Sequence, residues 1–217
     1  MKNLYSTILF TICFSFLGTM WLTAQIVNIP DPNFKAALLA DGNINTNDDG
    51  EIQVSEAEAA VDVSVVGNNI NDLTGIEAFI NITFLECSDN NLTSIDVSNN
   101  PELEIFECYN NQINSIDVSQ NTALYQFECR FNQLTSLDLS NNPNMVLLSM
   151  GNNEIMELDV ANNIILVILE CTETLLESLD LSQNNDLVSL ICNDNDALSY
   201  INLKNGNNEN LVFDGPF

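Results

Sequence analysis

Apolar and polar positions repeat with a period of 21 residues along most of the chain. From Ile82 the period reads I-x-x-L-x-C-x-x-N-x-L-x-x-I-D-V-S-x-N, and it begins again at Leu103, Leu124, Met145, Leu166 and Leu187. Within each period the residues L-E-C, or their equivalents, point inward, outward and inward again, as in a short β-strand. The pattern therefore predicts one short strand in every period, which we call a coil.

The coils are predicted to stack, because one coil alone cannot bury its apolar side. An earlier coil of 22 residues begins at Ala60, so that seven coils fill residues 60–208. Their strands would form one parallel sheet, and the second half of each coil is too short for a regular helix. We therefore expect an α/β solenoid with a parallel β-sheet on the concave face and short extended or 3₁₀ segments on the convex side.

The coils carry the signature L-x-x-L-x-L-x-x-N-x-L, and the chain resembles the leucine-rich repeat family over all seven copies. The short coils with their I-D-V-S-x-N second half are similar to secreted bacterial members, including surface proteins of Bacteroidetes, and "NNINDLTGIEAF" resembles the internalins. The chain departs from the signature at the cysteines, at Thr174 in the Asn column and at one extra residue before Leu198. The resemblance implies a binding surface on the concave face.

Two polar columns accompany the repeat. An Asn follows each predicted strand where the chain turns inward, and its amide can satisfy backbone groups there: Asn90, Asn111, Asn132, Asn153 and Asn195. A column of aspartates repeats in the second half of the coils: Asp96, Asp117, Asp138, Asp159 and Asp180. We interpret these aspartates as solvated turn acids that accept hydrogen bonds from the serines two residues along, with calcium binding as the alternative.

Residues 25–59 precede the repeats and are predicted to form a helical N-terminal cap. Asp31 can cap a helix with Pro32 in its first position, and this helix would extend to about Ala40. A second helix is expected from Ser55 to about Ala60. Together they would close the open end of the solenoid.

The cap contains "NTNDDGEIQVSE", residues 45–56, which resembles the calcium loop of the EF-hand family. The resemblance places Gly50 at the sharp turn and implies oxygen ligands from Asn45, Asn47, Asp49, Glu51 through its carbonyl, and Glu56. Only Asp49 and Glu56 would bring side-chain charge, so binding would be weak, in the millimolar class of extracellular modules. Calcium is the one candidate cofactor, and it is compatible with a capping role.

Residues 1–24 have the features of a secretory signal peptide: Lys2, a mostly apolar run from Leu4 to Leu22, and small residues before Gln25. A transmembrane anchor is the alternative, and no later apolar run is long enough to cross a bilayer. The sequence therefore predicts a secreted or cell-surface protein that begins at Gln25. Residues 209–217 are expected to be a C-terminal tail without a capping repeat, which favours a fragment of a longer surface protein.

The charge and the missing histidine exclude several functions. Four Lys and Arg residues stand against 31 Asp and Glu, giving a net charge of −27, and cleavage of the signal peptide would remove Lys2 as well. Such a surface repels nucleic acid and anionic membranes and attracts basic partners or divalent cations. Without histidine, the common general base and the Ser-His and Cys-His pairs are absent, and no glycine-rich phosphate loop occurs. We therefore expect that the protein is not an enzyme.

Five cysteines repeat in one column of the coils: Cys87, Cys108, Cys129, Cys171 and Cys192. Their odd number leaves at least one unpaired, and the Cβ vectors of neighbours in the column are nearly parallel, which suits a disulfide poorly. Met150 and Val65 occupy the same slot in other coils. We therefore interpret the column as a buried ladder of free thiols, with disulfides as the alternative.

A candidate binding site lies at outward positions of the middle coils. Tyr109, Arg130 and Phe131 would project from adjacent strands, flanked by Glu107 and Glu128. Exposed aromatics beside an arginine are typical of binding hot spots, although random variation of surface residues gives similar clusters. The predicted function is recognition of a protein or a glycan through the concave face. The alternative is a structural spacer, or a piece of a larger surface protein, with no ligand of its own.

Overall fold

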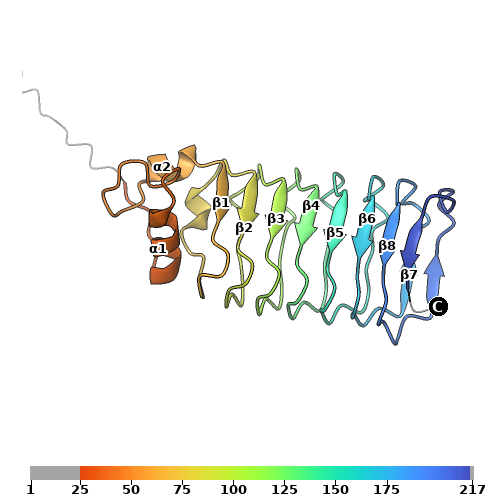
Figure 1. Cartoon of the computed structure of the whole chain (residues 1–217). Coiled ribbons are helices and arrows are strands. Elements are labelled where there is room, and N and C mark those ends of the chain that lie inside the picture. The colour runs from red at the N-terminus through yellow and green to blue at the C-terminus, as the bar shows by residue number, and fades with distance from the viewer. Residues whose placement is uncertain (1–24, 216–217) are drawn as a thin grey trace, which may run out of the picture.

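A computed structural model describes residues 25–215 of the 217-residue chain. The predicted signal peptide, residues 1–24, lies outside the described residues, as do Pro216 and Phe217. The described part is an elongated stack of coils with two helices at its N-terminal end (Figure 1). This confirms the predicted solenoid with a parallel sheet.

Helices α1 (Pro32–Ala40) and α2 (Val54–Ala59) form the cap, close to the positions that the sequence predicts. The Asp31 carboxylate starts α1 by accepting the backbone N–H groups of Asn33 and Phe34 at 2.8 and 3.1 Å. Phe34 and Leu38 form the buried side of α1. A backbone bridge between Ile26 and Gln53 ties the segment before α1 to the start of α2.

Each coil contributes one three-residue strand to an eight-stranded parallel sheet (Figure 1). Neighbouring strands are aligned without a shift, so that Phe106 lies opposite Phe127 and Glu107 opposite Glu128. The order is β1-β2-β3-β4-β5-β6-β8-β10. Their bounds are β1 Asp62–Ser64, β2 Phe84–Glu86, β3 Ile105–Glu107, β4 Gln126–Glu128, β5 Leu147–Ser149, β6 Ile168–Glu170, β8 Ser189–Ile191 and β10 Val212–Asp214.

The C-terminal residues differ from the expected tail. Val212–Asp214 form β10, which pairs with β8 and adds an eighth position to the sheet. Phe213 continues the inward column of Leu190, but 40% of its surface stays exposed because no further strand covers it in the described chain. The repeat signature is lost there, which is why the sequence pattern gave no strand.

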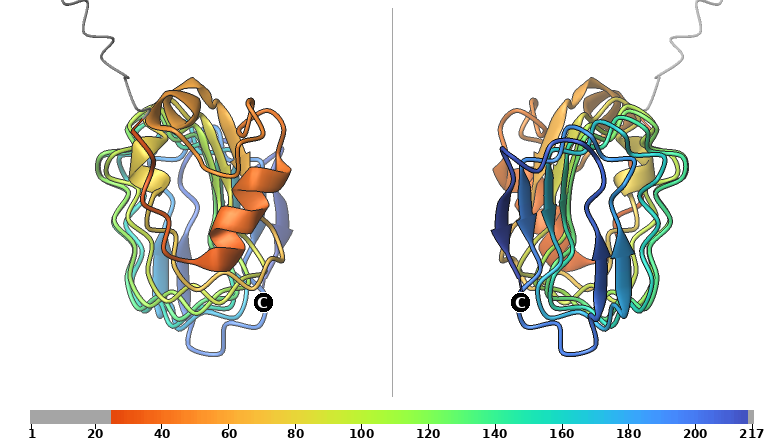
Figure 2. Two further views of the ribbon diagram at one scale, coloured as in Figure 1. Left: turned by 90° about the vertical axis from the view of Figure 1, so that its left-hand side faces the viewer. Right: turned by 90° about the vertical axis from the view of Figure 1, so that its right-hand side faces the viewer.

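The opposite side of the coils is mostly extended chain and turns, as expected. It carries the 3₁₀ helix η1 (Ile76–Ala78) in the first coil and a two-stranded parallel sheet of β7 (Ser178–Asp180) and β9 (Tyr200–Asn202). Seen along the axis, the coils superimpose as a flattened ring with the two sheets on opposite sides (Figure 2).

Two columns of buried or half-buried asparagine hold the coils together. The predicted column after the strands is confirmed: the Asn132 amide donates to the carbonyl oxygens of Cys108 and Cys129, each at 3.0 Å. A second column lies on the other side of the ring, where the Asn121 amide donates to Val97 and Asn100 oxygens. Both columns bridge one coil to the next, and they satisfy carbonyl groups that a short strand leaves unpaired. The second column comprises Asn100, Asn121, Asn142, Asn163, Asn184 and Asn205.

Candidate functional site

The outward face of the eight-stranded sheet presents the first and third residue of each strand, because the middle residue points into the core. We call this surface the sheet face. The third positions of four strands form a carboxylate column of Glu86, Glu107, Glu128 and Glu170, which Ser149 of β5 interrupts between Glu128 and Glu170. Gln126 donates to Glu107 at 3.2 Å and to Glu128 at 3.0 Å, so it bridges two members of the column.

The structure brings four of the five predicted site residues into direct or bridged contact. The guanidinium of Arg130 lies 4.1 Å from the centre of the Tyr109 ring and also forms an ion pair with Glu128. Glu107 joins this group through Gln126. The arrangement is a cation–π pair fixed by a carboxylate, which holds Arg130 on the sheet face and leaves it half-buried.

Phe131, the fifth residue, has a strained backbone and an exposed side chain. Its φ angle is 54°, in the left-handed region, and 49% of its surface is exposed. The same position in other coils carries Asp89, Asn110, Asn152 and Asp194, which tolerate this conformation, and also Glu173. Phe131 therefore combines backbone strain with an aromatic ring that the fold does not bury. We call Tyr109, Arg130, Phe131, Glu107 and Glu128 the central patch.

Burial and the neighbouring carboxylates perturb the pKa of Glu107 in the carboxylate column. Burial raises the pKa of Glu107, and the neighbouring charges of Glu128 and Glu86 raise it further, while Arg130 acts in the opposite direction. The pKa of Glu107 therefore lies above its ordinary value. A positive group placed over this column would relieve the repulsion.

A second organised carboxylate, Glu170, lies two strands from Glu128 on the sheet face and was not among the predicted site residues. Glu170 accepts the Ser149 hydroxyl at 2.6 Å and the backbone N–H groups of Gly151 and Thr172 at 3.3 and 3.0 Å. A Cβ atom at Gly151 would lie 2.8 Å from the Thr172 oxygen and would collide with the Glu170 carboxylate. The sequence signal was present, since Gly151 and Ser149 interrupt columns that other coils fill with larger side chains.

The EF-hand-like loop is closed by its own carboxylate. Glu56, only 6% exposed, accepts the Thr46 N–H and hydroxyl at 2.9 Å, the Asn47 N–H at 3.3 Å and the Gln53 N–H at 3.1 Å. Burial raises the pKa of Glu56, but these hydrogen bonds outweigh it, so that the pKa is lowered. One carboxylate oxygen of Glu56 thus accepts an N–H at the start of α2, and the other accepts the N–H groups of the loop. This arrangement supports the role of residues 25–59 as a cap of the solenoid.

The other predicted calcium ligands occupy different environments. Asn47 and Asp49 are exposed and form successive turns by accepting the N–H groups of Asp49 and Glu51, each at 2.9 Å. The Glu51 side chain pairs with Lys35 at 2.5 Å. Asn45 is 7% exposed, and its side-chain oxygen has no hydrogen-bond partner. Among residues 25–215, no group of three or more acidic or Cys side chains is placed to hold a metal ion, so calcium would depend on amide and carbonyl oxygens as well.

Calcium binding by this loop stays a prediction, and melting curves test it. We expect millimolar calcium to raise the melting temperature, because an ion that binds only the folded loop stabilises it. Glu56→Gln should abolish the rise, since it removes one of two side-chain charges at the site. Glu58→Gln, on the exposed side of α2, should keep it. No rise in the parent chain contradicts the prediction, and an equal rise in Glu56→Gln assigns calcium to the acidic surface instead.

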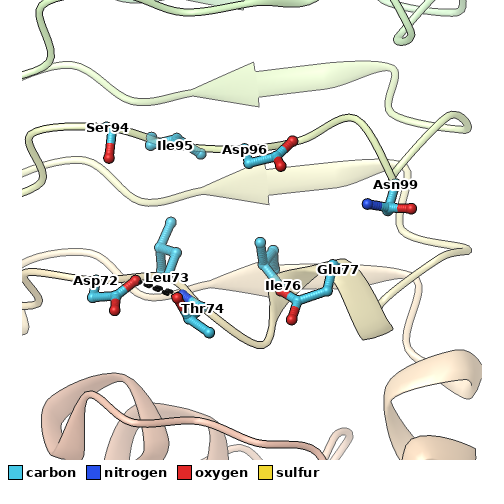
Figure 3. A pocket seen from close by; sticks show the side chains of 9 residues that line it. All are labelled: Asp72, Leu73, Thr74, Ile76, Glu77, Ser94, Ile95, Asp96 and Asn99. Atoms are coloured by element: carbon cyan, nitrogen blue, oxygen red, sulfur yellow. Dashed lines mark hydrogen bonds between the residues drawn. The ribbon is translucent and has the colours of Figure 1, made fainter.

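The aspartate column lies on the side opposite the sheet face and is hydrogen-bonded, as expected. Each member accepts the backbone N–H two residues along, and bonds from the serines at these positions lower the pKa of Asp96, Asp117, Asp138 and Asp180. Shallow hollows of about 290 to 400 Å³ lie between adjacent coils on this side. In the largest, Asp72, Glu77 and Asp96 project from two coils (Figure 3), and each already accepts a backbone N–H of its own turn.

The cysteine column is a buried ladder of free thiols, which confirms that interpretation over disulfides. Within residues 25–215, all five cysteines of the column are unpaired and fully buried. Burial raises the pKa of Cys87, Cys108 and Cys129. A hydrogen bond that the Cys171 thiol donates to Cys192, together with burial, raises the pKa of Cys171, and the same bond lowers the pKa of Cys192. Such thiols are protonated at neutral pH and serve as medium-sized core residues.

No protein-family model matches the chain, and no curated protein matches it either. Solved structures do. A functional domain of InlJ from Listeria monocytogenes, described as including a cysteine ladder, is similar at a TM-score of 0.78 and 29% identity. The match covers 88% of this chain but 43% of that one, so the chain spans less than half the length of this relative.

Two further structures share the fold at lower identity. Internalin C2 of Listeria monocytogenes gives a TM-score of 0.59 at 18% identity, covering 84% of this chain and 94% of that one. A leucine-rich repeat protein of Leptospira interrogans gives 0.50 at 19% identity, covering 72% and 47%. The architecture is therefore that of a leucine-rich repeat solenoid, which these structures share. In residues 25–215, none of the helices has the length and apolar character that crossing a membrane requires.

Proposed function

We propose that the chain is a non-enzymatic binding module, secreted or displayed at the cell surface, that recognises a protein through the sheet face. Binding centres on the central patch. The similarity to internalin-type solenoids and the leader-like residues 1–24 support this proposal. A glycan is the alternative partner.

One observation carries the proposal, namely the exposed ring of Phe131 on a left-handed backbone. An aromatic residue at positive φ destabilises the folded state by about 1–2 kcal/mol relative to a residue that tolerates it. Burial of the ring could offset this, but half of Phe131 remains in solvent. Contact with a partner would complete that burial, so the residue makes physical sense in a complex.

The surroundings of Phe131 favour tight binding. Arg130 stacks on the ring of Tyr109, and Glu128 forms an ion pair with the same guanidinium. The strands below are paired on both sides, so that little conformational entropy is lost when a partner docks. Aromatic rings and an arginine at the centre of a rigid surface are the usual composition of a hot spot.

A double substitution tests the central patch. Partners are first captured from culture or host extract with the chain from Gln25 onward, identified, and measured against purified variants. Tyr109→Ala with Phe131→Ala should weaken binding by about 2 kcal/mol or more, roughly 30-fold, because both rings are lost from the hot spot. The melting temperature should hardly change, since neither ring lies in the core.

Two controls sharpen this experiment. Tyr200→Ala removes an exposed tyrosine from β9, on the opposite side, and should leave binding unchanged. Phe131→Asn should raise stability by about 1 kcal/mol through relief of strain, yet still weaken binding. A partner that binds the double variant as tightly as the parent chain contradicts the proposal, and a chain that captures nothing favours the structural spacer.

A further inference from the structure

The sheet face carries two parallel rows of different chemistry along the solenoid. The third strand positions form the carboxylate column described above. The first strand positions are largely apolar, and each is half-buried: Phe84, Ile105, Leu147 and Ile168. Both rows cross the same strands, because every outward side chain repeats at the same register.

The apolar row is widened by the residues just before the strands. Where Gln126 interrupts the row, Tyr125 precedes it. Val146, Val167 and Val188 continue at the same register in the next three coils, and Val188 is 37% exposed. These residues are not needed to fill the core, which the columns inside the coils already occupy. We call Phe84, Ile105, Tyr125, Val146, Leu147, Val167, Ile168 and Val188 the apolar row.

We propose that the partner presents a cationic amphipathic helix, which lies along the solenoid with its apolar side on the apolar row and its Lys or Arg side chains over the carboxylate column. This rests on the proposed function and names its partner class. Contiguous apolar surface beside polar surface marks interaction sites on soluble proteins. The carboxylates favour a positively charged occupant, since Arg130 offsets only part of their mutual repulsion.

The shape of the two rows selects a helix over an extended segment. They run side by side about 7 Å apart, the spacing of residues i and i+2 in a strand. A single helix can present an apolar stripe and a basic stripe on adjacent parts of its surface. An extended peptide alternates its side chains between two sides, and it would therefore meet only one row.

The length of the site is set by the strand spacing. The apolar row crosses six neighbouring strands from Phe84 on β2 to Val188 beside β8, a span of about 24 Å at roughly 4.8 Å per step, and the carboxylate column accompanies it from β2 to β6. A helix of about 16 residues covers that distance. The central patch lies within this span, on β3 and β4 and the residues that follow them, so Tyr109 and Phe131 would contact the same helix or its immediate flank.

Two synthetic peptides test the proposal directly. Both are about 16 residues long and contain the same numbers of Leu and Lys. One has Leu on a single helical face, and the other is shuffled so that no face is apolar. The facial peptide should bind the chain at least about tenfold more tightly than the shuffled one. Its affinity should fall with rising ionic strength.

Variants of each row identify the surface. Leu147→Thr with Ile168→Thr should weaken the facial peptide by about tenfold or more and leave the shuffled peptide unchanged. Met156→Thr, an exposed apolar residue outside the strands, serves as the matched control and should change neither. Glu86→Gln with Glu107→Gln should weaken both peptides and reduce the dependence on ionic strength.

If the two peptides bind equally, or if the apolar-row variant has no effect, the proposal of an amphipathic helix as the partner is wrong. The same conclusion holds if the chain binds anionic phosphatidylglycerol vesicles or random RNA more tightly than the facial peptide. The proposed function is judged separately. If a captured protein loses affinity for the Tyr109→Ala/Phe131→Ala variant while the two peptides bind alike, the sheet face binds a partner of another shape.

Discussion

Phe127→Ala is expected to lower the free energy of unfolding by about 4 kcal/mol, because it opens a large cavity in the middle of the stack. Phe127 is fully buried, and its ring stacks on that of Phe106 with centroids 5.4 Å apart. Phe106 and Phe127 are the inward residues of β3 and β4, and the central patch lies on these two strands and the residues that follow them. Urea unfolding followed by circular dichroism measures the loss.

Two control variants test whether the loss of stability in Phe127→Ala comes from a cavity in the core. Phe127→Leu should cost only about 1 kcal/mol, since leucine fills this column at Leu85, Leu148, Leu169 and Leu190. Phe213→Ala truncates the same column at its exposed end and should also cost about 1 kcal/mol. If Phe127→Ala is no more harmful than Phe213→Ala, the middle coils do not form a close-packed core.

Asp31→Ala is expected to lower the free energy of unfolding by about 3 kcal/mol, because it leaves four backbone N–H groups without an acceptor. One Asp31 oxygen caps α1, and the other accepts the N–H groups of Asn71 and Asp72 in the first coil at 2.8 and 3.2 Å. The residue therefore joins the cap to the solenoid. Chemical unfolding of the chain from Gln25 onward measures the change.

Acid should erase the advantage of the parent chain over Asp31→Asn. Burial raises the pKa of Asp31, but its four hydrogen bonds outweigh this and the pKa is lowered. The unfolded chain therefore binds the proton first, and the contribution of Asp31 is complete above about pH 4 and is lost below it, as pH falls through the folded pKa. Asp48→Asn, at an exposed turn, is the control and should stay within about 0.5 kcal/mol of the parent. A difference between Asp31→Asn and the parent that persists at low pH contradicts this account.

The central patch was predictable as a set of neighbours but not as a structure. Register alone places Glu107 beside Glu128, because a repeat of fixed length aligns equivalent residues on adjacent strands. The stacking of Arg130 on Tyr109 and the left-handed backbone of Phe131 depend on rotamers and on the turn after the strand. A 21-residue period contains no information on either.

In the cap, the spacing of a motif predicted the turn but not the contacts of its carboxylate. Residues 45–56 have the spacing of a calcium loop, yet in the folded chain Glu56 accepts N–H groups of the loop and of Gln53. The same residue types serve both arrangements, since a carboxylate that can bind an ion can also accept several amides. Spacing therefore identified the turn correctly and left the occupant of the Glu56 oxygens open.

The sequence by itself determined the solenoid, its coil length, the inward columns and the free-thiol ladder, because each follows from a periodic pattern that only a stack can bury. The tertiary structure decided what depends on contacts between residues far apart in the chain. Asp31 reaches Asn71, Ser149 and Gly151 hold Glu170, and Val212–Asp214 joins the sheet although the repeat signature has ended. The physical reason is that burial follows periodicity, whereas a hydrogen bond to a distant backbone group depends on where the folded coils bring that group.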